Sequence, residues 1–408
     1  MDLLLTPHKL SGTVTPPPSK SESHRLLLAA ALAEGESRLH GFAPSADLRA
    51  TLRGIEALGA AWDEPAPGEL RIRGCGARRQ SEPLRLDCGA SGSTLRFLLP
   101  LALALCGGGD FTGDKRLLER PMRPYFDLFD EQGIAWRLSD GLLRVRGALQ
   151  PGGFRLDGAV SSQFFSGLLF ALPLLEAPSR LNWTSPPVSA GYLRLTASVL
   201  TSAGIALRET AEGYTVHPSA YRPLEAAVEK DWSQAAFWIA ARELGSELRV
   251  TGLNSDSLQP DRRIASLAAD LREAGERTID LSQCPDLLPP LAAIAVLRRG
   301  GCTLTGAGRL RGKESDRLAS VSAAFRALGA EIDERENGLR ITGREKLPGG
   351  AAVDCAGDHR VAMAVAAAAA RCEEPVLLRG ADCVNKSYPD FWEVYRSLGG
   401  CCDVVELG

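Results

Sequence analysis

The 408-residue chain has few lysines, few histidines and no long apolar run. Lysine supplies only seven of its 47 cationic side chains, and there are five histidines. The longest apolar stretches, residues 97–106, 164–175 and 361–370, are shorter than the roughly 20 residues that cross a bilayer. We therefore expect buried helices there. The first residues also lack the basic, apolar pattern of a signal peptide, so a cytoplasmic protein outside the membrane is expected.

The cysteines and the charge balance exclude further classes of protein. The ten cysteines include no Cys-x-x-Cys pair, and the histidines are scattered, so we expect neither a disulfide framework nor a metal site. Reduced, buried cysteines are the expected state. The net charge of −3 argues against a broadly basic nucleic-acid-binding surface.

A unit of about seventy residues recurs six times along the chain. Its first copy has Leu48, Leu52 and Ile55 on one apolar helical stripe, Gly59 at the helix end, and an alternating strand at residues 70–74. The other copies lie around Gly133, Gly204, Gly275, Gly329 and Gly399, with strands expected at residues 143–147, 214–217 and 339–343. A period of about seventy residues favours duplicated βα subdomains. The alternative is an ordinary alternation of helices and strands without duplication.

Two proline-containing segments divide these six units into two groups of three. One is the hinge at residues 15–18, and the other lies near residues 221–223. Two crossings imply that the first strand, expected from Leu3 to Val14, belongs with the C-terminal half. We therefore predict an α/β protein with one domain formed by residues 20–228 and a discontinuous domain formed by residues 1–19 and 229–408. Ligands often bind in the cleft between two such lobes.

Three segments of the N-terminal half combine small polar or cationic residues with the start of an apolar helix. Residues 19–25 place Lys20 and Arg25 at a helix start, where exposed N–H groups favour anions. Residues 88–96 form a turn of small residues, which predicts either an oxyanion or phosphate cradle or a plain tight turn. Residues 161–163, Ser-Ser-Gln, begin a third apolar helix, and Arg120 lies before a proline.

The C-terminal half carries a denser charged segment. Residues 311–317 read Arg-Gly-Lys-Glu-Ser-Asp-Arg, and Lys313 and Arg317 would share one face if they were helical. Salt bridging at a helix start is the alternative. Residues 357–360, Gly-Asp-His-Arg, precede an alanine-rich helix, and Lys386 lies shortly before Tyr388-Pro389-Asp390.

In this order and spacing, the segments from Lys20 to Asp390 resemble the EPSP synthase (3-phosphoshikimate 1-carboxyvinyltransferase) family of enolpyruvyl transferases. Lys20-Ser21 with Arg25 resembles the opening motif of the family, and Gly92 to Arg96 resembles its Gly-Thr-x-x-Arg loop. Glu119-Arg120-Pro121, Ser161-Ser162-Gln163, Lys313 to Arg317 and Asp358-His359-Arg360 resemble the later motifs, and Asp286 takes the place of the catalytic aspartate.

The resemblance implies a two-domain inside-out α/β barrel fold, in which each domain has three βαβαββ units and the active site lies in the interdomain cleft. It implies transfer of the enolpyruvyl group of phosphoenolpyruvate to the 5-hydroxyl of shikimate 3-phosphate, with release of phosphate, in aromatic amino-acid biosynthesis. It requires no metal and no organic cofactor, and it suggests a monomer.

The resemblance also assigns residues to the two substrates. Shikimate 3-phosphate is assigned to Lys20, Ser21, Arg25, Ser161, Ser162, Gln163, Ser189, Asp286 and Lys313. Phosphoenolpyruvate is assigned to Lys20, Gly92, Arg96, Arg120, Gln163, Arg317, Arg360 and Lys386. Many cations suit substrates with phosphates and carboxylates, and an ionised Asp286 suits the role of base on the attacking hydroxyl. Glu314 and Lys20 are the candidates for proton delivery, in an order that the sequence leaves open.

The chain departs from the family pattern at a few positions. Ala90 replaces a frequent asparagine, Ser93 replaces threonine, Arg309 stands where some members carry asparagine, and Ala190-Gly191 replace Lys-Pro. One alternative is a UDP-N-acetylglucosamine enolpyruvyl transferase, but that family uses a loop cysteine and this chain has none between Cys106 and Cys284. A non-catalytic binder of a phosphorylated metabolite is the second alternative.

Overall fold

The chain divides into two units, and the first unit is formed by both ends of the sequence. In the computed structural model, which describes residues 1–405, unit 1 comprises Met1–Pro17 and Lys230–Gly408, and unit 2 comprises Pro18–Glu229. Each unit has its own cluster of buried apolar side chains. Each is therefore described by itself below.

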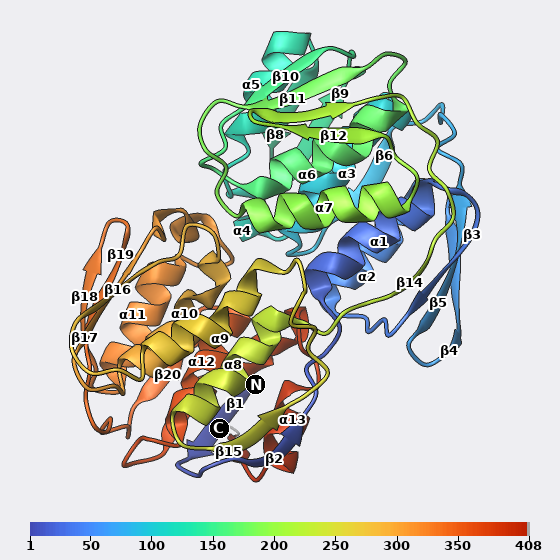
Figure 1. Cartoon of the computed structure of the whole chain (residues 1–408). Helices are drawn as coiled ribbons and strands as arrows, with labels where there is room; N and C mark the ends of the chain where they lie inside the picture. The colour runs from blue at the N-terminus through green and yellow to red at the C-terminus, as the bar shows by residue number, and fades with distance from the viewer. Residues whose placement is uncertain (406–408) are drawn as a thin grey trace. The chain divides into compact units, whose positions relative to one another are not determined.

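Unit 2 contains alternating helices and short strands (Figure 1). Its helices are α1 (Lys20–Leu32), α2 (Ala46–Ala57), α3 (Gly92–Leu105), α4 (Lys115–Leu118), α5 (Arg123–Gln132), α6 (Ser162–Ala171), the 3-10 turn η1 (Leu172–Leu174) and α7 (Ala190–Ser202). Its strands are β3 (Glu34–His40), β4 (Ala61–Ala66), β5 (Glu69–Cys75), β6 (Leu84–Asp87), β7 (Gly108–Thr112), β8 (Ala135–Ser139), β9 (Leu142–Arg146), β10 (Gly153–Leu156), β11 (Ser179–Trp183), β12 (Leu207–Thr210), β13 (Gly213–Val216) and β14 (Glu225–Ala227).

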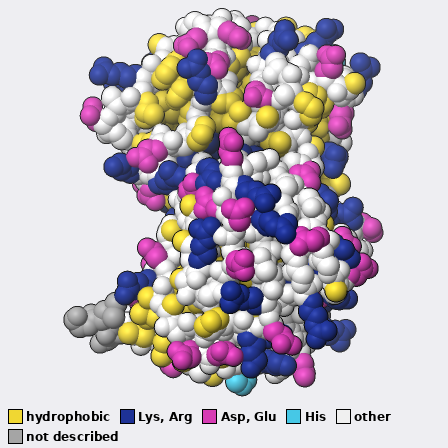
Figure 2. All heavy atoms as spheres, turned by 90° about the vertical axis from the view of Figure 1, so that its left-hand side faces the viewer, with side chains coloured by type: hydrophobic (Ala, Val, Ile, Leu, Met, Phe, Trp, Pro, Cys, Tyr) yellow, Lys and Arg dark blue, Asp and Glu magenta, His cyan; other side chains and the backbone are white. Residues whose placement is uncertain are grey.

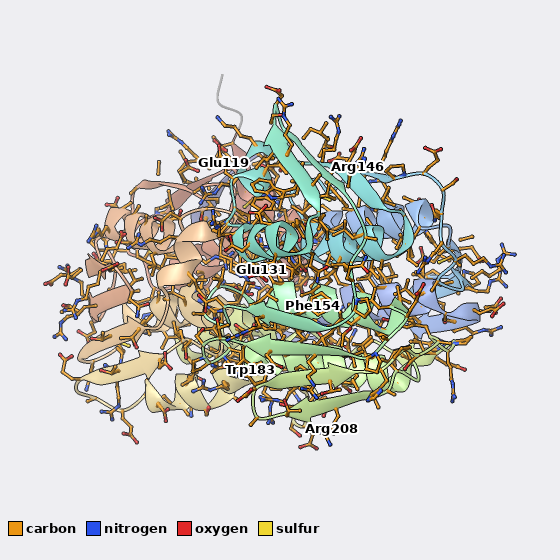
Figure 3. The ribbon with its side chains drawn as sticks, turned by 90° about the horizontal axis from the view of Figure 1, so that it is seen from above. Glu119, Glu131, Arg146, Phe154, Trp183 and Arg208 are labelled. Atoms are coloured by element: carbon orange, nitrogen blue, oxygen red, sulfur yellow. The ribbon has the colours of Figure 1, made fainter. Side chains whose placement is uncertain are left out.

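The strands of unit 2 form three four-stranded sheets with one common plan. Their orders are β14-β3-β5-β4, β6-β7-β9-β8 and β10-β11-β13-β12. In each sheet the first two strands are parallel and the remaining pairings are antiparallel. Figure 3 labels Phe154, Trp183 and Arg208 on β10, β11 and β12 of the third sheet. The threefold recurrence of this plan is the repeat that the sequence predicts.

Unit 1 is built from the same parts. Its helices are α8 (Trp232–Glu243), η2 (Pro260–Arg263), α9 (Ile264–Asp270), η3 (Pro285–Leu287), α10 (Leu288–Ala295), η4 (Gly308–Gly312), α11 (Arg317–Ala327), α12 (His359–Ala369), η5 (Ala381–Lys386) and α13 (Phe391–Ser397). Its strands are β1 (Asp2–Thr6), β2 (Ser11–Val14), β15 (Glu247–Val250), β16 (Arg277–Asp280), β17 (Gly301–Thr305), β18 (Glu331–Arg335), β19 (Gly338–Thr342), β20 (Ala352–Asp354), β21 (Val376–Arg379) and β22 (Cys401–Val405).

The sheets of unit 1 require strands from the N-terminus. The sheet β16-β17-β19-β18 follows the common plan, and in β20-β21-β1-β22 the strand β1 occupies the third position. The remaining sheet contains only β2 and β15, which are parallel. It lacks a hairpin because only residues 271–276 separate α9 from β16.

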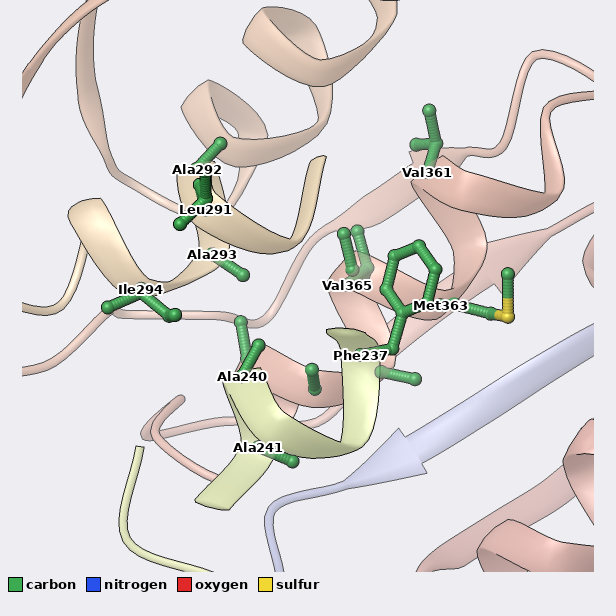
Figure 4. Packing of buried hydrophobic residues seen from close by; sticks show 14 of the residues in the cluster. Phe237, Ala240, Ala241, Leu291, Ala292, Ala293, Ile294, Val361, Met363 and Val365 are labelled. Atoms are coloured by element: carbon green, nitrogen blue, oxygen red, sulfur yellow. The ribbon is translucent and has the colours of Figure 1, made fainter. Parts of the chain in front are cut away.

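Small side chains allow the three central helices of unit 1 to pack closely. Figure 4 shows Phe237 and Ala240 on α8, Ala293 on α10, and Met363 and Val365 on α12 in one buried cluster. These five side chains are at most 3% exposed. Alanine and leucine also favour helix formation, so local propensity and burial agree here.

The structure confirms the mixed α/β fold with repeated βαβ units, and it corrects one expected element. The strands expected at residues 70–74, 143–147, 214–217 and 339–343 are β5, β9, β13 and β19. The single strand expected from Leu3 to Val14 is instead two strands, β1 and β2, in different sheets. Residues 7–10 belong to neither strand and separate the two, so the expectation of one continuous strand was wrong. The pairings among residues 1–405 give six separate sheets and describe no closed barrel.

The structure shows the state of the cysteines and the distribution of charge on the surface. All ten cysteines are free thiols and seven of them are buried. Acidic and basic side chains are interspersed on the face drawn in Figure 2. No helix within residues 1–405 is long and apolar enough to cross a membrane.

Candidate active site

Three helices of unit 2 begin at residues that the sequence assigns to substrates. Helices α1, α3 and α6 start at Lys20, Gly92 and Ser162. The preceding serines accept hydrogen bonds from backbone N–H groups of each first turn, at 3.4, 3.2 and 3.3 Å. A helix start with small residues and nearby cations favours a bound anion. We call the assigned residues of this unit the unit 2 cluster: Lys20, Ser21, Arg25, Gly92, Arg96, Arg120, Ser161, Ser162, Gln163 and Ser189.

Arg25 is a buried cation with neutral hydrogen-bond acceptors. Its side chain donates to the hydroxyls of Thr196 (2.7 Å) and Ser166 (3.3 Å) and to the carbonyls of Ser21 (2.6 Å) and Tyr192 (3.3 Å). It is 3% exposed, and burial lowers the pKa of its guanidinium to about 10. These contacts join α1 to α6 and α7, and they fix the guanidinium without neutralising its charge.

Lys20 forms an ion pair at the start of α1. Its Nζ lies 2.7 Å from Oδ2 of Asp47, and both side chains are largely buried. Asp47 belongs to α2, whose first turn it helps to form. The partner aspartate therefore sets the position of the ammonium group.

The turn before α3 packs directly on an arginine. A Cβ atom added to Gly92 would lie 2.7 Å from Nη1 of Arg120, so a larger residue there would displace this guanidinium. Nη1 of Arg96 donates to Oε1 of Gln163 at 2.6 Å, and Nε2 of Gln163 donates to Oγ of Ser93 at 2.9 Å. The loops at residues 88–96, 120 and 161–163 thus meet within unit 2.

A chain of buried hydroxyls connects the starts of α1 and α3. Nδ1 of His24 lies 2.7 Å from Oγ1 of Thr51, which lies 2.7 Å from Oγ1 of Thr94, which in turn donates to Oγ of Ser91 at 2.7 Å. Burial, followed by the charges of Lys20 and Arg25, lowers the pKa of His24 well below its usual value. His24 is therefore neutral in the folded protein.

Ser162 and Ser189 complete the cluster. Ser162 is buried at the first position of α6. Ser189 precedes α7 with φ 55° and ψ 40°, a left-handed backbone conformation that non-glycine residues rarely adopt. Such conformations concentrate at functional sites.

In unit 1, the carboxylate of Asp286 lies among three cations. Its Oδ1 accepts from Nη1 of Arg317 (2.9 Å) and lies 3.9 Å from Nζ of Lys313, while its Oδ2 accepts from Nη2 of Arg360 (3.1 Å). With Glu314 and Lys386, these residues form the unit 1 cluster. Burial by itself raises the pKa of Asp286, but Arg360, Lys313 and Arg317 outweigh it and hold that pKa well below its usual value.

Arg317 joins three carboxylates at the start of α11. Besides Asp286, its guanidinium donates to Oε2 of Glu314 (2.6 Å) and to Oδ2 of Asp358 (2.8 Å). Arg317 is 1% exposed and Asp358 is fully buried. Burial lowers the pKa of Arg317, but Asp358, Glu314 and Asp286 raise it above its usual value.

The expected helical face shared by Lys313 and Arg317 is not observed. Lys313 follows the 3-10 turn η4, and Arg317 is the first residue of α11. Residues 313–315 form bends and Asp316 caps α11, so the spacing of four does not correspond to one helical turn. Both side chains nevertheless reach Asp286.

Lys386 approaches the residues before α12. Its Nζ donates to the carbonyl of Gly357 at 3.0 Å, and Asp358 caps α12 by accepting from the backbone N–H of Arg360 at 3.0 Å. The segments 357–360 and 381–386 are therefore neighbours within unit 1.

Three acidic residues near the two clusters have no role assigned from the sequence. Asp47 pairs with Lys20, Asp358 pairs with Arg317, and Asp261 is a buried carboxyl that accepts a hydrogen bond from Ser233. Burial and the charge of Asp286 raise the pKa of Asp261 to about 6. Asp358 belongs to the motif Asp358-His359-Arg360, so the sequence could have marked it as a site residue. Asp47 and Asp261 belong to no such motif. Within residues 1–405 no group of three His, Cys, Asp or Glu side chains is placed to hold a metal ion.

Repeated βαβ units with cations gathered at helix starts define a protein that binds small phosphorylated or carboxylated molecules. The model of the family described as EPSP synthase (3-phosphoshikimate 1-carboxyvinyltransferase) matches residues 4–395. The chain belongs to this family.

Curated relatives and solved structures agree with this membership. The chain is 40% identical to the 3-phosphoshikimate 1-carboxyvinyltransferase of Clostridium kluyveri, with 99% of each chain covered. It is 38% identical to that of Clostridioides difficile, with 100% and 99% covered. Its fold is similar to EPSP synthase from Acinetobacter baumannii (TM-score 0.80, 23% identity, 99% and 100% covered) and to the enolpyruvyl transferase NikO from Streptomyces tendae (TM-score 0.76, 19% identity, 98% of each covered).

Proposed function

We propose that the protein transfers the enolpyruvyl group of phosphoenolpyruvate to the 5-hydroxyl of shikimate 3-phosphate and releases phosphate. The observation that carries this proposal is the carboxylate of Asp286 held between Arg317, Arg360 and Lys313. This arrangement supplies both a base and cations for anionic substrates. The named relatives favour this activity over transfer to a UDP-sugar and over a non-catalytic binder.

The reaction proceeds by addition and elimination. Asp286 accepts the proton of the 5-hydroxyl as its oxygen attacks C2 of phosphoenolpyruvate, and an acid delivers a proton to C3. The tetrahedral adduct then expels phosphate and regains the double bond as a proton leaves C3. Glu314 and Lys20 are the proposed proton donors, and their order stays open.

The low pKa of Asp286 bears on its role as base. A base works best when its pKa lies near the working pH, and the cations around Asp286 hold its pKa far below that. Phosphate and carboxylate groups that pair with Arg317, Arg360 and Lys313 would offset these charges. Substrate binding is therefore proposed to raise the basicity of Asp286 as the reactants are assembled.

The proposed assignments give each substrate residues of both clusters. Shikimate 3-phosphate is proposed to use Lys20, Ser21, Arg25, Ser161, Ser162, Gln163, Ser189, Asp286 and Lys313. Phosphoenolpyruvate is proposed to use Lys20, Gly92, Arg96, Arg120, Gln163, Arg317, Arg360 and Lys386. The buried, unneutralised charge of Arg25 and the close approach of the Arg120 guanidinium to Gly92 support these assignments.

The test is a phosphate-release assay. Phosphate should be released from phosphoenolpyruvate only when shikimate 3-phosphate is present, and folded protein that releases none would refute the proposal. Asp286→Ala should still bind shikimate 3-phosphate by calorimetry but turn over at least about 10²-fold more slowly, as for a lost general base. Asp333→Ala, which removes an exposed surface carboxylate, is the matched control.

We also propose a cytoplasmic monomer with no nucleic-acid or membrane partner. The ten free thiols, most of them buried, support a reducing compartment, and the net charge of −3 supports the lack of a nucleic-acid partner. Light scattering coupled to size-exclusion chromatography should give one 43.5 kDa chain. A mass of twice this value would refute the monomer.

A further inference from the structure

Two cysteines of unit 1 lie next to residues that are proposed to bind phosphoenolpyruvate. Cys355 follows β20 and lies five residues before Arg360. Cys383 lies within η5, three residues before Lys386. Neither cysteine has a role in the proposed reaction.

The backbone brings the two cysteines together. Strands β20 and β21 are parallel, with Asp354 opposite Arg379. The backbone N–H of Cys355 donates to the carbonyl of Arg379 at 3.1 Å, and that of Cys383 donates to the carbonyl of Gly380 at 3.2 Å. Both cysteines are therefore anchored to two consecutive residues at the end of β21.

These backbone hydrogen bonds place both thiols beside the end of β21, and the two thiols differ in accessibility. A hydrogen bond with Cys383 is the largest cause of the raised pKa of the Cys355 thiol, followed by burial. Cys355 is fully buried, whereas Cys383 is only partly buried. An oxidant from solution therefore reaches Cys383 first, and Cys355 is the adjacent thiol that can resolve the product.

We propose that Cys355 and Cys383 form a reversible disulfide, and that this disulfide weakens phosphoenolpyruvate binding by fixing the segments that carry Arg360 and Lys386. With a peroxide as oxidant, the Cys383 sulfur attacks the O–O bond to give a sulfenic acid and water. The Cys355 sulfur then displaces a second water and forms the S–S bond. Two thiols and one peroxide thus give one disulfide and two waters, with two electrons passing from sulfur to oxygen.

The coupling to the ligand passes through Lys386. Its Nζ already donates to the carbonyl of Gly357, across the same two segments that the disulfide would join. An S–S bond of about 2.05 Å is much shorter than a contact between two thiols, so oxidation draws these segments together. It holds the ammonium group against Gly357 and restricts its movement toward an anionic ligand. This consequence rests on the function proposed above, whereas the disulfide itself does not.

The first experiment tests formation of the disulfide by mass spectrometry. Reduced full-length protein treated with hydrogen peroxide and digested with trypsin should yield one linked pair of peptides, residues 347–360 with residues 380–386. Dithiothreitol should separate them. Cys383→Ser and Cys355→Ser should each abolish the linked pair, whereas Cys75→Ser, which alters a partly buried cysteine of unit 2, should not. Absence of the linked pair in the unmodified chain, or oxidation confined to other cysteines, overturns the proposal.

The functional step is tested on the same samples. Oxidation should raise the KM for phosphoenolpyruvate by about tenfold, the loss expected for one charge-assisted hydrogen bond, and dithiothreitol should restore it. Cys383→Ser should keep its reduced KM after peroxide. A mapped disulfide with an unchanged KM overturns the coupling. A reduced protein that releases no phosphate at all contradicts the proposed function instead, while the peptide map still decides whether the disulfide forms.

Discussion

Nη1 of Arg317 lies 2.9 Å from Oδ1 of Asp286, and the same buried guanidinium also reaches Glu314 and Asp358. One guanidinium thus donates hydrogen bonds to three carboxylates in unit 1. A buried ion pair contributes little net stability over an apolar replacement, but removing one partner leaves the other charges uncompensated. Arg317 is therefore a structural requirement for the unit 1 cluster as well as a proposed ligand-binding residue.

We expect Arg317→Met to lower the free energy of unfolding by about 3–5 kcal/mol, the range for breaking a buried pair. Arg335→Met removes an exposed arginine that pairs with Asp333 and should cost less than about 1 kcal/mol. Urea unfolding followed by circular dichroism measures both. Equal losses in the two variants would contradict the structural role of Arg317.

Gly92→Ala should impair phosphoenolpyruvate binding, because the new Cβ would lie 2.7 Å from Nη1 of Arg120 and displace the guanidinium. We expect the KM for phosphoenolpyruvate to rise about tenfold or more, as for loss of a charge-assisted hydrogen bond. Gly153→Ala is the matched control, since nothing lies within 4 Å of a Cβ there. Steady-state kinetics of both variants check the prediction, and an unchanged KM in Gly92→Ala would count against it.

Asp261 should make the folded protein less stable as the pH rises through about 6. Its folded pKa of about 6 lies above its unfolded value near 4, so the folded state holds the proton more tightly. The stabilisation is complete below the unfolded pKa and is lost as the pH rises through the folded pKa. Between pH 5 and pH 8 the natural chain should therefore lose about 1–2 kcal/mol relative to Asp261→Asn. Urea unfolding at both pH values measures this, and a difference that does not change with pH would contradict it.

His24 should act in the opposite direction. Its folded pKa lies well below the unfolded value near 6.5, so the unfolded state binds the proton and stability falls as the pH falls below 6.5. From pH 7.5 to pH 5 we expect the natural chain to lose on the order of 2 kcal/mol relative to His24→Gln. His217→Gln, which alters an exposed histidine, is the control for the loss of an imidazole elsewhere in the chain. A parallel pH dependence in all three proteins would refute a neutral His24.

The sequence predicted the repeated elements because their signals are local. The six glycines that mark the repeat all have positive φ, between 68° and 93°. Gly133 caps its helix and four others directly follow a C-cap residue, whereas Gly275 lies five residues beyond the end of its helix α9. Apolar periodicity and glycine positions are enough to find such units. The structure divides the chain at 17/18 and 229/230, and the domain bounds at residues 19/20 and 228/229 stay a prediction.

The contacts inside the clusters could not be predicted in the same way. Asp47 lies 27 residues from Lys20, and Asp358 lies 41 residues from Arg317. Such pairs depend on how separate βαβ units pack against each other, and a local sequence pattern does not predict that packing. The expected helical face for Lys313 and Arg317 was wrong for a local reason, because spacing alone does not show that a helix starts only at Arg317.

The exchange of strands between the two ends of the chain sets an order for folding during synthesis. Unit 2 is one continuous segment, residues 18–229, so all its sheets can form once that segment has left the ribosome. β1 and β2 emerge first but must wait, because Leu3 pairs with Val404 and Gly12 pairs with Leu248. Contacts so distant in sequence form slowly. β2 can therefore pair once β15 has emerged, whereas β1 remains an unpaired edge until β21 and β22 have been made.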